Sequence, residues 1–258
     1  MALPQQEQHA SAVGAVVYRT PVEAAFEQDY LQIRELEQRV YSDAQVAQLP
    51  AVSSGHPHHR EWQMRARSAQ RFAAHIKRTG VRHLLDVGCG NGWFSALVAR
   101  ETGCRVEGWD INSTELAQAA RVFPADGLQF CYADLFAVDD PALGFDAVVI
   151  NSAVQYFPDL HRLLEQLFQW LPSGGAVHLI DSPFYAEEEV AAARERTQAY
   201  YRELGTEGRG DYYHHRTWSE LQGLEVEVCY DPRTRKQRLL RKLGTVDSPF
   251  PWLAIRKP

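Results

Sequence analysis

Residues 81–95, VRHLLDVGCGNGWFS, constrain the fold of this chain more than any other stretch. Apolar residues at positions 84, 85 and 87 are typical of a buried parallel strand, and Gly88, Gly90 and Gly92 follow at once. Glycine adopts positive φ angles and lets a ligand approach the main chain, while the next helix turns its unpaired N–H groups toward the same crevice. The stretch therefore predicts a strand, a turn and a helix around a nucleotide pocket.

The glycine spacing argues against a dinucleotide. A Gly-x-Gly-x-x-Gly fingerprint would place glycine or alanine at position 93, where this chain has Trp93. A bulky indole there opposes the tight approach that a pyrophosphate requires.

The length and net charge of the chain narrow the possible folds and the possible substrates. A chain of 258 residues with 45% hydrophobic composition can bury one large core, so we expect one α/β domain with an appendage. The formal net charge of −6 gives no overall attraction to nucleic acid, whose binding depends on neutralised phosphates. We expect neither a nucleic acid nor any other polyanionic polymer as substrate.

The four cysteines and the N-terminus predict a soluble cytoplasmic protein without stable membrane association. No two cysteines form a Cys-x-x-Cys pair, so neither disulfides nor zinc are expected. The first twenty residues lack the pattern of a signal peptide, and no run is long and apolar enough to span a bilayer. His56, His58 and His59 lie in a proline-containing loop that would not fix ligand geometry, so we expect no metal site.

The order of segments predicts three parts. Residues 1–20 show no sustained period and are expected to form a flexible leader. Residues 21–80 carry two amphipathic patterns, over 24–41 and 60–79, separated by a linker, and predict an N-terminal helical cap. Residues 81–258 predict a Rossmann-like domain, with an aromatic-rich insertion at 182–223.

Strand and helix patterns alternate regularly through that domain. Strands are expected near 104–110, 128–133, 145–150 and 176–181, and two late strands near 224–230 and 252–256. Asn112 and Glu115 have the spacing of a helix N-cap and its capping-box partner. The alternation predicts a mostly parallel sheet with helices on both faces, and a ligand outside the carboxyl ends of its strands.

Three carboxylates follow successive predicted strands. Asp86, Asp110 and Asp134 are spaced 24 residues apart, each at or just after the end of a strand. An acidic residue at the end of the second strand can accept hydrogen bonds from both ribose hydroxyls. Together with the glycines, these carboxylates predict a nucleoside site.

At this point the sequence resembles the class I S-adenosylmethionine-dependent methyltransferases of the small-molecule type. The resemblance rests on LLDVGCGNGWFS, WDIN, YADL, FDAVVINSAVQYF and LPSGG, and covers residues 84–181. It implies a seven-stranded, mostly parallel sheet of order 3-2-1-4-5-7-6 with strand seven antiparallel, and S-adenosyl-L-methionine as cofactor. The residues that it assigns to cofactor binding are Asp86, Gly88, Cys89, Gly90, Asp110, Ile111, Asp134, Leu135 and Asn151.

The flanks of these motifs are expected to hold the methyl acceptor. Candidate acceptor-binding residues are Trp62, Arg65, Tyr212 and Tyr213, although an aromatic-rich insertion can equally be a lid that packs on itself. Transfer to a protonated oxygen or nitrogen needs a base, for which His214, Tyr156 and Asp181 are the candidates. Histidine titrates near neutrality, so His214 is preferred.

The predicted activity is methyl transfer to an oxygen or nitrogen of a small molecule. A non-catalytic cofactor-binding or partner-binding protein of the same fold is the alternative, and a nicotinamide-dependent oxidoreductase is the weaker one because of Trp93. The basic run at 233–242 is read as a solvated helix or loop face, with contact to a phosphate-bearing acceptor or an anionic membrane surface as the alternative. The sequence does not decide the acceptor or the oligomeric state.

Overall fold

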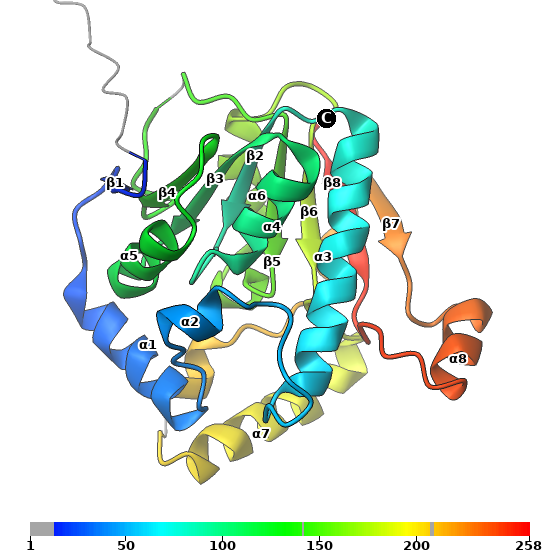
Figure 1. The fold of residues 1–258 in the computed structure, drawn as a ribbon. Coiled ribbons are helices and arrows are strands. Elements are labelled where there is room, and N and C mark those ends of the chain that lie inside the picture. The colour runs from blue at the N-terminus through cyan, green and yellow to red at the C-terminus, as the bar shows by residue number, and fades with distance from the viewer. Residues whose placement is uncertain (1–12, 141, 207–208) are drawn as a thin grey trace, which may run out of the picture.

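A computed structural model describes residues 13–140, 142–206 and 209–258, and within them one sheet has the strand order β1-β4-β3-β2-β5-β6-β8-β7 (Figure 1). The strands are β1 (Val16–Tyr18), β2 (His83–Val87), β3 (Arg105–Asp110), β4 (Leu128–Tyr132), β5 (Ala147–Asn151), β6 (Ala176–Ile180), β7 (Val226–Tyr230) and β8 (Trp252–Arg256). The helices are α1 (Ala24–Leu36), α2 (Asp43–Val46), α3 (His59–Thr79), α4 (Trp93–Thr102), α5 (Ser113–Val122), α6 (Leu160–Gln169), α7 (Glu187–Glu203) and α8 (Arg235–Lys242).

The order of seven strands confirms the prediction. Numbered along the chain from β2, the strands from β4 to β7 follow the order 3-2-1-4-5-7-6. β8 pairs antiparallel with both β6 and β7, whereas the other pairs are parallel. The carboxyl ends of β2, β3, β4, β5 and β6 therefore meet at one edge of the sheet.

An eighth strand, β1, lies in the segment that was expected to be a flexible leader, so this expectation is wrong for residues 16–18. Residues 1–12 lie outside the described part of the chain, but β1 pairs parallel with β4, with Val16 opposite Phe130. Arg19 then forms an ion pair of 2.9 Å with buried Glu107 and lies over the Trp109 ring. A strand of three residues has too few positions to show a period in the sequence, and it is held by β4 rather than by its own pattern.

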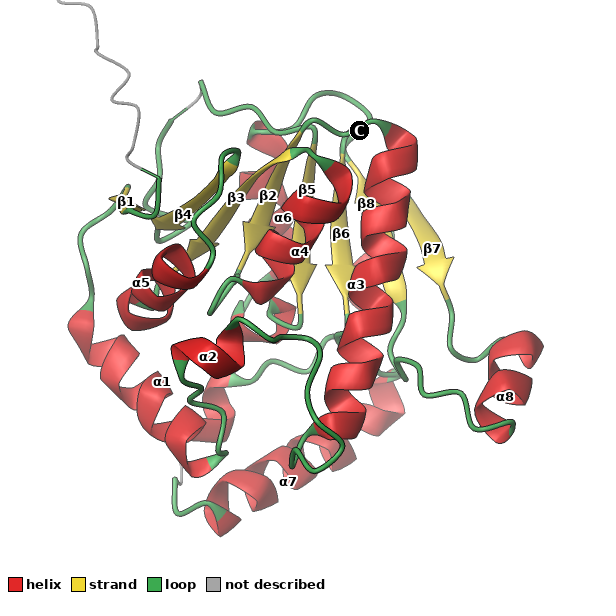
Figure 2. Cartoon of the chain, viewed as in Figure 1, coloured by secondary structure: helices red, strands yellow, loops and turns green. Residues whose placement is uncertain are grey.

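Helices cover both faces of the sheet (Figure 2). α3, α4 and α5 lie on one face and α6 lies on the other, while α1, α2 and α7 gather beyond the carboxyl ends of the strands. The leucine stripe of α6 is fully buried, and Asp159 caps this helix by accepting a hydrogen bond of 3.0 Å from the Arg162 N–H. Phe72 of α3 and Phe94 of α4 share the core of the opposite face.

No helix among the described residues is long and apolar enough to cross a membrane.

Candidate functional site

A cavity of about 700 Å³ lies beyond the carboxyl ends of the strands. Its inner wall consists of strand ends and the glycine-rich turn, and its outer wall of residues from α1, α3, α7 and their loops. This is the position predicted for a ligand in an open α/β sheet.

The glycine-rich turn requires glycine for conformational and steric reasons. Gly88 has a φ of +75°, and a Cβ there would lie 2.6 Å from the Ala153 side chain. Gly92 has a φ of +76°, and its Cβ would lie 2.5 Å from the Phe130 ring. Trp93 begins α4 and packs edge-on against Trp62, with ring centroids 5.3 Å apart, so the indole forms part of the core and of the cavity wall.

Asp86 is buried at the end of β2 beneath this turn. Its Oδ2 accepts a hydrogen bond of 2.5 Å from the Ser95 hydroxyl of α4. Burial raises the pKa of Asp86 to about 7, and the nearby Asp110 carboxylate adds to the effect. The carboxyl therefore titrates near neutral pH.

Asp110 at the end of β3 holds the turn in place. Its Oδ2 accepts a hydrogen bond of 2.8 Å from the Gly90 N–H, and its Oδ1 accepts bonds from the N–H groups of Ile111 and Asn112. Burial raises the pKa of Asp110 even though these three donors lower it. The carboxylate faces the cavity with its position fixed by the backbone.

Glu115 is a cavity residue that the sequence analysis assigned only to helix capping. Asn112 Oδ1 accepts a hydrogen bond of 3.0 Å from the Glu115 N–H, as predicted, but the Glu115 side chain does not complete the predicted capping box. Its Oε2 is buried without a hydrogen-bond partner among the described residues and lies 3.3 Å from the ideal Cβ position of Gly90. Burial, together with Asp110 and Glu27, raises the pKa of Glu115 to about 7, although Arg34 opposes the shift.

The inner half of the cavity fits a nucleoside with a cationic tail. Glu115 Oε2 and Asn151 Oδ1 are both buried there without a hydrogen-bond partner in the described chain, so a ligand can supply donors to them. Asp134 lines the same half, with its Oδ1 accepting a bond of 3.0 Å from the Phe136 N–H. Every residue predicted from the resemblance to hold the cofactor lines this cavity: Asp86, Gly88, Cys89, Gly90, Asp110, Ile111, Asp134, Leu135 and Asn151.

The outer half of the cavity is rich in aromatic rings and arginines. Trp62, Arg65 and Tyr213 line it, as predicted for the acceptor, whereas Tyr212 does not and is 57% exposed. Tyr185, Tyr200 and Tyr201, which belong to the flank expected to hold the acceptor, line it as well. Further lining side chains that were not assigned to the site are Arg34, Arg39, Tyr41, Arg196 and Phe250.

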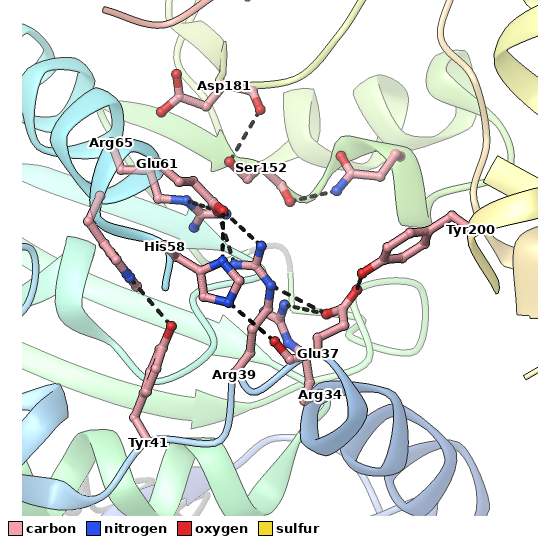
Figure 3. A network of polar contacts seen from close by, with 12 residues as sticks. Arg34, Glu37, Arg39, Tyr41, His58, Glu61, Arg65, Ser152, Asp181 and Tyr200 are labelled. Atoms are coloured by element: carbon pink, nitrogen blue, oxygen red, sulfur yellow. Dashed lines mark hydrogen bonds and ion pairs between the residues drawn. The ribbon is translucent and has the colours of Figure 1, made fainter. Parts of the chain in front are cut away.

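A polar network joins the segments around this outer half (Figure 3). Arg39 binds both carboxylate oxygens of Glu61, at 3.0 and 2.7 Å, and Arg65 donates to the same carboxylate at 2.9 Å. The Tyr200 hydroxyl of α7 donates a hydrogen bond of 2.8 Å to Glu37, which follows α1. The network therefore connects the N-terminal helices to the aromatic-rich insertion across the cavity.

Two of the three candidate bases lie at the cavity. Asp181 follows β6, has a φ of +52°, and accepts a hydrogen bond of 2.7 Å from Ser68 of α3. Burial raises its pKa, although hydrogen bonds from Ser248 and Ser68 oppose the shift. Tyr156 also lines the cavity and stacks edge-on against Tyr213.

The preferred candidate, His214, is not brought to this cavity. Its backbone N–H donates to the Gln155 carbonyl at 2.8 Å, and its side chain lines a separate hollow with Arg194 and Glu220. The adjacent His215 is buried, with its Nε2 3.0 Å from the Thr197 hydroxyl. Both histidines line this separate hollow, and residues 213–216 belong to no helix or strand, so no local periodicity could predict which cavity either histidine faces.

No group of three or more metal-ligating side chains occurs among the residues that the structure describes.

Comparisons with known proteins agree with this arrangement. Residues 84–175 match the family model of a methyltransferase domain. The malonyl-[acyl-carrier protein] O-methyltransferase of Enterobacter lignolyticus is 32% identical over 122 residues, which are 47% of each chain. The trans-aconitate 2-methyltransferase of Paracidovorax citrulli is 31% identical over 115 residues, which are 44% of each chain. The chain thus spans about half the length of the curated relatives it matches.

A solved structure shares the fold over most of the chain. The plantazolicin methyltransferase BpumL, in complex with a triazolic desmethylPZN analog and SAH, superposes with a TM-score of 0.56 at 15% identity. The match covers 90% of this chain and 95% of that protein, so the likeness of fold extends to both flanks of the matched domain.

Proposed function

We propose that this chain, whose residues 84–175 match a methyltransferase domain, is an S-adenosylmethionine-dependent enzyme that methylates an oxygen or nitrogen of a small molecule. One observation carries the proposal. A single cavity combines an inner half of strand-end carboxylates and bare glycine backbone with an outer half of aromatic rings and arginines.

The inner half supplies the groups that the cofactor needs. Asp110 would accept hydrogen bonds from the ribose hydroxyls, and Ile111 would pack on the adenine. Asp134, with the Leu135 backbone beside it, would accept from the adenine amino group. The turn at Gly88 and Asn151 would hold the methionine part, and the orphaned Asn151 Oδ1 supports a polar ligand there.

The protein's own contribution is alignment, exclusion of water and removal of a proton. S-adenosylmethionine, when bound, supplies the activated methyl group. The aromatic outer wall would orient the acceptor and keep water out. Asp181 is the base that this site supports best, because it is a lining residue of the cavity and burial raises its pKa.

The acceptor class and the cellular setting belong to the same proposal. The relatives are named for malonyl-[acyl-carrier protein] and trans-aconitate, which supports a small or carrier-bound acceptor. The net charge of −6 argues against a nucleic acid. Cys89, Cys104, Cys131 and Cys229 are free thiols, which supports a reducing cytoplasmic location.

Calorimetry with S-adenosylmethionine, S-adenosylhomocysteine and NAD tests the proposal. We expect both sulfur compounds to bind and NAD not to bind. The Asp110→Ala variant should bind S-adenosylhomocysteine at least tenfold more weakly, since it loses charge-assisted hydrogen bonds. Absence of binding by either sulfur compound would remove the proposal, and unchanged affinity in the variant would remove the role given to Asp110.

A further inference from the structure

The outer half of the cavity contains two arginines, Arg39 and Arg65, that bind the same carboxylate. Arg39 and Arg65 line the cavity, whereas Glu61, the carboxylate that both guanidinium groups share, does not. The two guanidinium groups therefore reach the cavity, while the carboxylate that they share is not among its lining residues.

These two guanidinium groups have fixed positions. Glu61 sits on α3 and keeps a pKa of about 2 because Arg39 and Arg65 outweigh its burial, so it stays ionised at all physiological pH values. Arg65 also lies over the Trp62 ring, with its guanidinium carbon 5.3 Å from the ring centroid. Both arginine side chains are largely covered, at 20% and 23% exposure, so an incoming group would not have to order them.

Arginines are the main cationic side chains in this part of the wall. Four arginines line the outer half, namely Arg34, Arg39, Arg65 and Arg196, while its lining carboxylates are Glu37 and Asp181. Glu27 also lines the cavity, where it accepts hydrogen bonds from the Ser113 and Thr114 hydroxyls of α5, and the remaining acidic lining residues belong to the inner half.

We propose that the methyl acceptor carries an anionic group, a carboxylate or a phosphate, which Arg39 and Arg65 bind while its body packs against the surrounding tyrosines. This proposal rests on the proposed methyltransferase function and adds the acceptor's class to it. A guanidinium group has five N–H donors, and Glu61 takes up only some of those on each arginine. Glu37 lies 3.5 Å from the Arg39 Nε and leaves the other donors of this arginine unchanged. The donors that remain match the planar geometry of a carboxylate or the oxygens of a phosphate.

Matched acids and amides test the proposal directly. Dissociation constants of 4-hydroxybenzoate, 4-hydroxybenzamide, benzoate, benzamide and phenyl phosphate are measured by tryptophan fluorescence, with S-adenosylhomocysteine present at saturation. We expect each acid to bind about tenfold or more tightly than its amide, because the amide forms no charge-assisted bond. The phenyl phosphate arm distinguishes a phosphate from a carboxylate as the preferred group.

Variants separate a binding role from a structural one. Arg65→Gln and Arg39→Gln should each abolish most of the preference for acids, and Arg65→Lys should restore part of it because the charge is kept. Arg121→Gln is the control, since Arg121 forms a comparable ion pair with Asp43 outside the cavity. Each variant is first checked for S-adenosylhomocysteine binding, which reports an intact fold.

The outcomes distinguish failure of this inference from failure of the proposed function. If S-adenosylhomocysteine does not bind the unaltered protein, the proposed function fails. The dissociation constants of the acids and amides are then measured with the cofactor-free protein and still test the role of the arginines. If no acid binds more tightly than its amide, or if the preference survives in both glutamine variants, the anionic acceptor is ruled out.

Discussion

Replacing Glu115 by glutamine should stabilise the protein at alkaline pH and leave its stability at acid pH almost unchanged. The pKa of this carboxyl rises from an ordinary value of 4.5 to about 7 on folding, because it is buried beside Asp110 and Glu27 and only Arg34 opposes the shift. A group whose pKa is higher in the folded state contributes stability below its unfolded pKa and loses that contribution as the pH rises through its folded pKa. At about 1.4 kcal/mol for each unit of pKa difference, the ionised carboxylate costs about 3–4 kcal/mol above pH 8.

Thermal and urea unfolding of the cofactor-free protein at pH 5 and pH 8.5 would measure this cost. Glu115→Gln should match the unaltered protein at pH 5 and unfold about 7–14 °C higher at pH 8.5, given the usual 2–4 °C per kcal/mol for domains of this size. Asp86 also has a pKa of about 7, but its contribution is common to both proteins and cancels in the difference. Glu101→Gln serves as the control because the Glu101 side chain is 53% exposed. Equal unfolding temperatures at pH 8.5 would refute the reasoning, since they would mean that the carboxylate is solvated or paired.

Three further variants test the fold, the chemistry and the basic helix. Gly92→Ala should lower the unfolding free energy by about 3 kcal/mol, measured in urea, because its Cβ would lie 2.5 Å from the Phe130 ring at a φ of +76°. Asp181→Asn should reduce kcat at least a hundredfold and remove the rise of rate with pH that ionisation of this carboxyl produces. His214→Ala should change neither kcat nor its pH dependence, and the reverse result would identify His214 as the base. Arg238→Ala on the exposed α8 should leave kcat/KM within twofold of the unaltered protein, and a larger loss would give the basic run a role in acceptor binding.

The sequence by itself determined seven strands of the sheet and most residues of the inner half of the cavity. Strand periodicity, the glycines of the turn and the carboxylates at the strand ends are local signals, and parallel strands bring their carboxyl ends to one edge whatever the surrounding loops do. Asp86, Asp110 and Asp134 could therefore be assigned to one site before any contact was known. The order of the seven strands followed from the resemblance rather than from periodicity.

Tertiary structure alone decided which residues form the outer half of the cavity and where the side chains of Glu115 and His214 lie. Arg39 and Glu61 are 22 residues apart and Tyr200 and Glu37 are 163 apart, so only the packing of α1, α3 and α7 over the strand ends could bring them together. Glu115 satisfied a local capping pattern, yet the close approach of the glycine turn placed its carboxyl in the cavity, and the side to which His214 points depended on how the insertion folds back. Local spacing specifies which residues lie on one element, whereas the contacts between elements depend on the burial of surfaces that are distant in the chain.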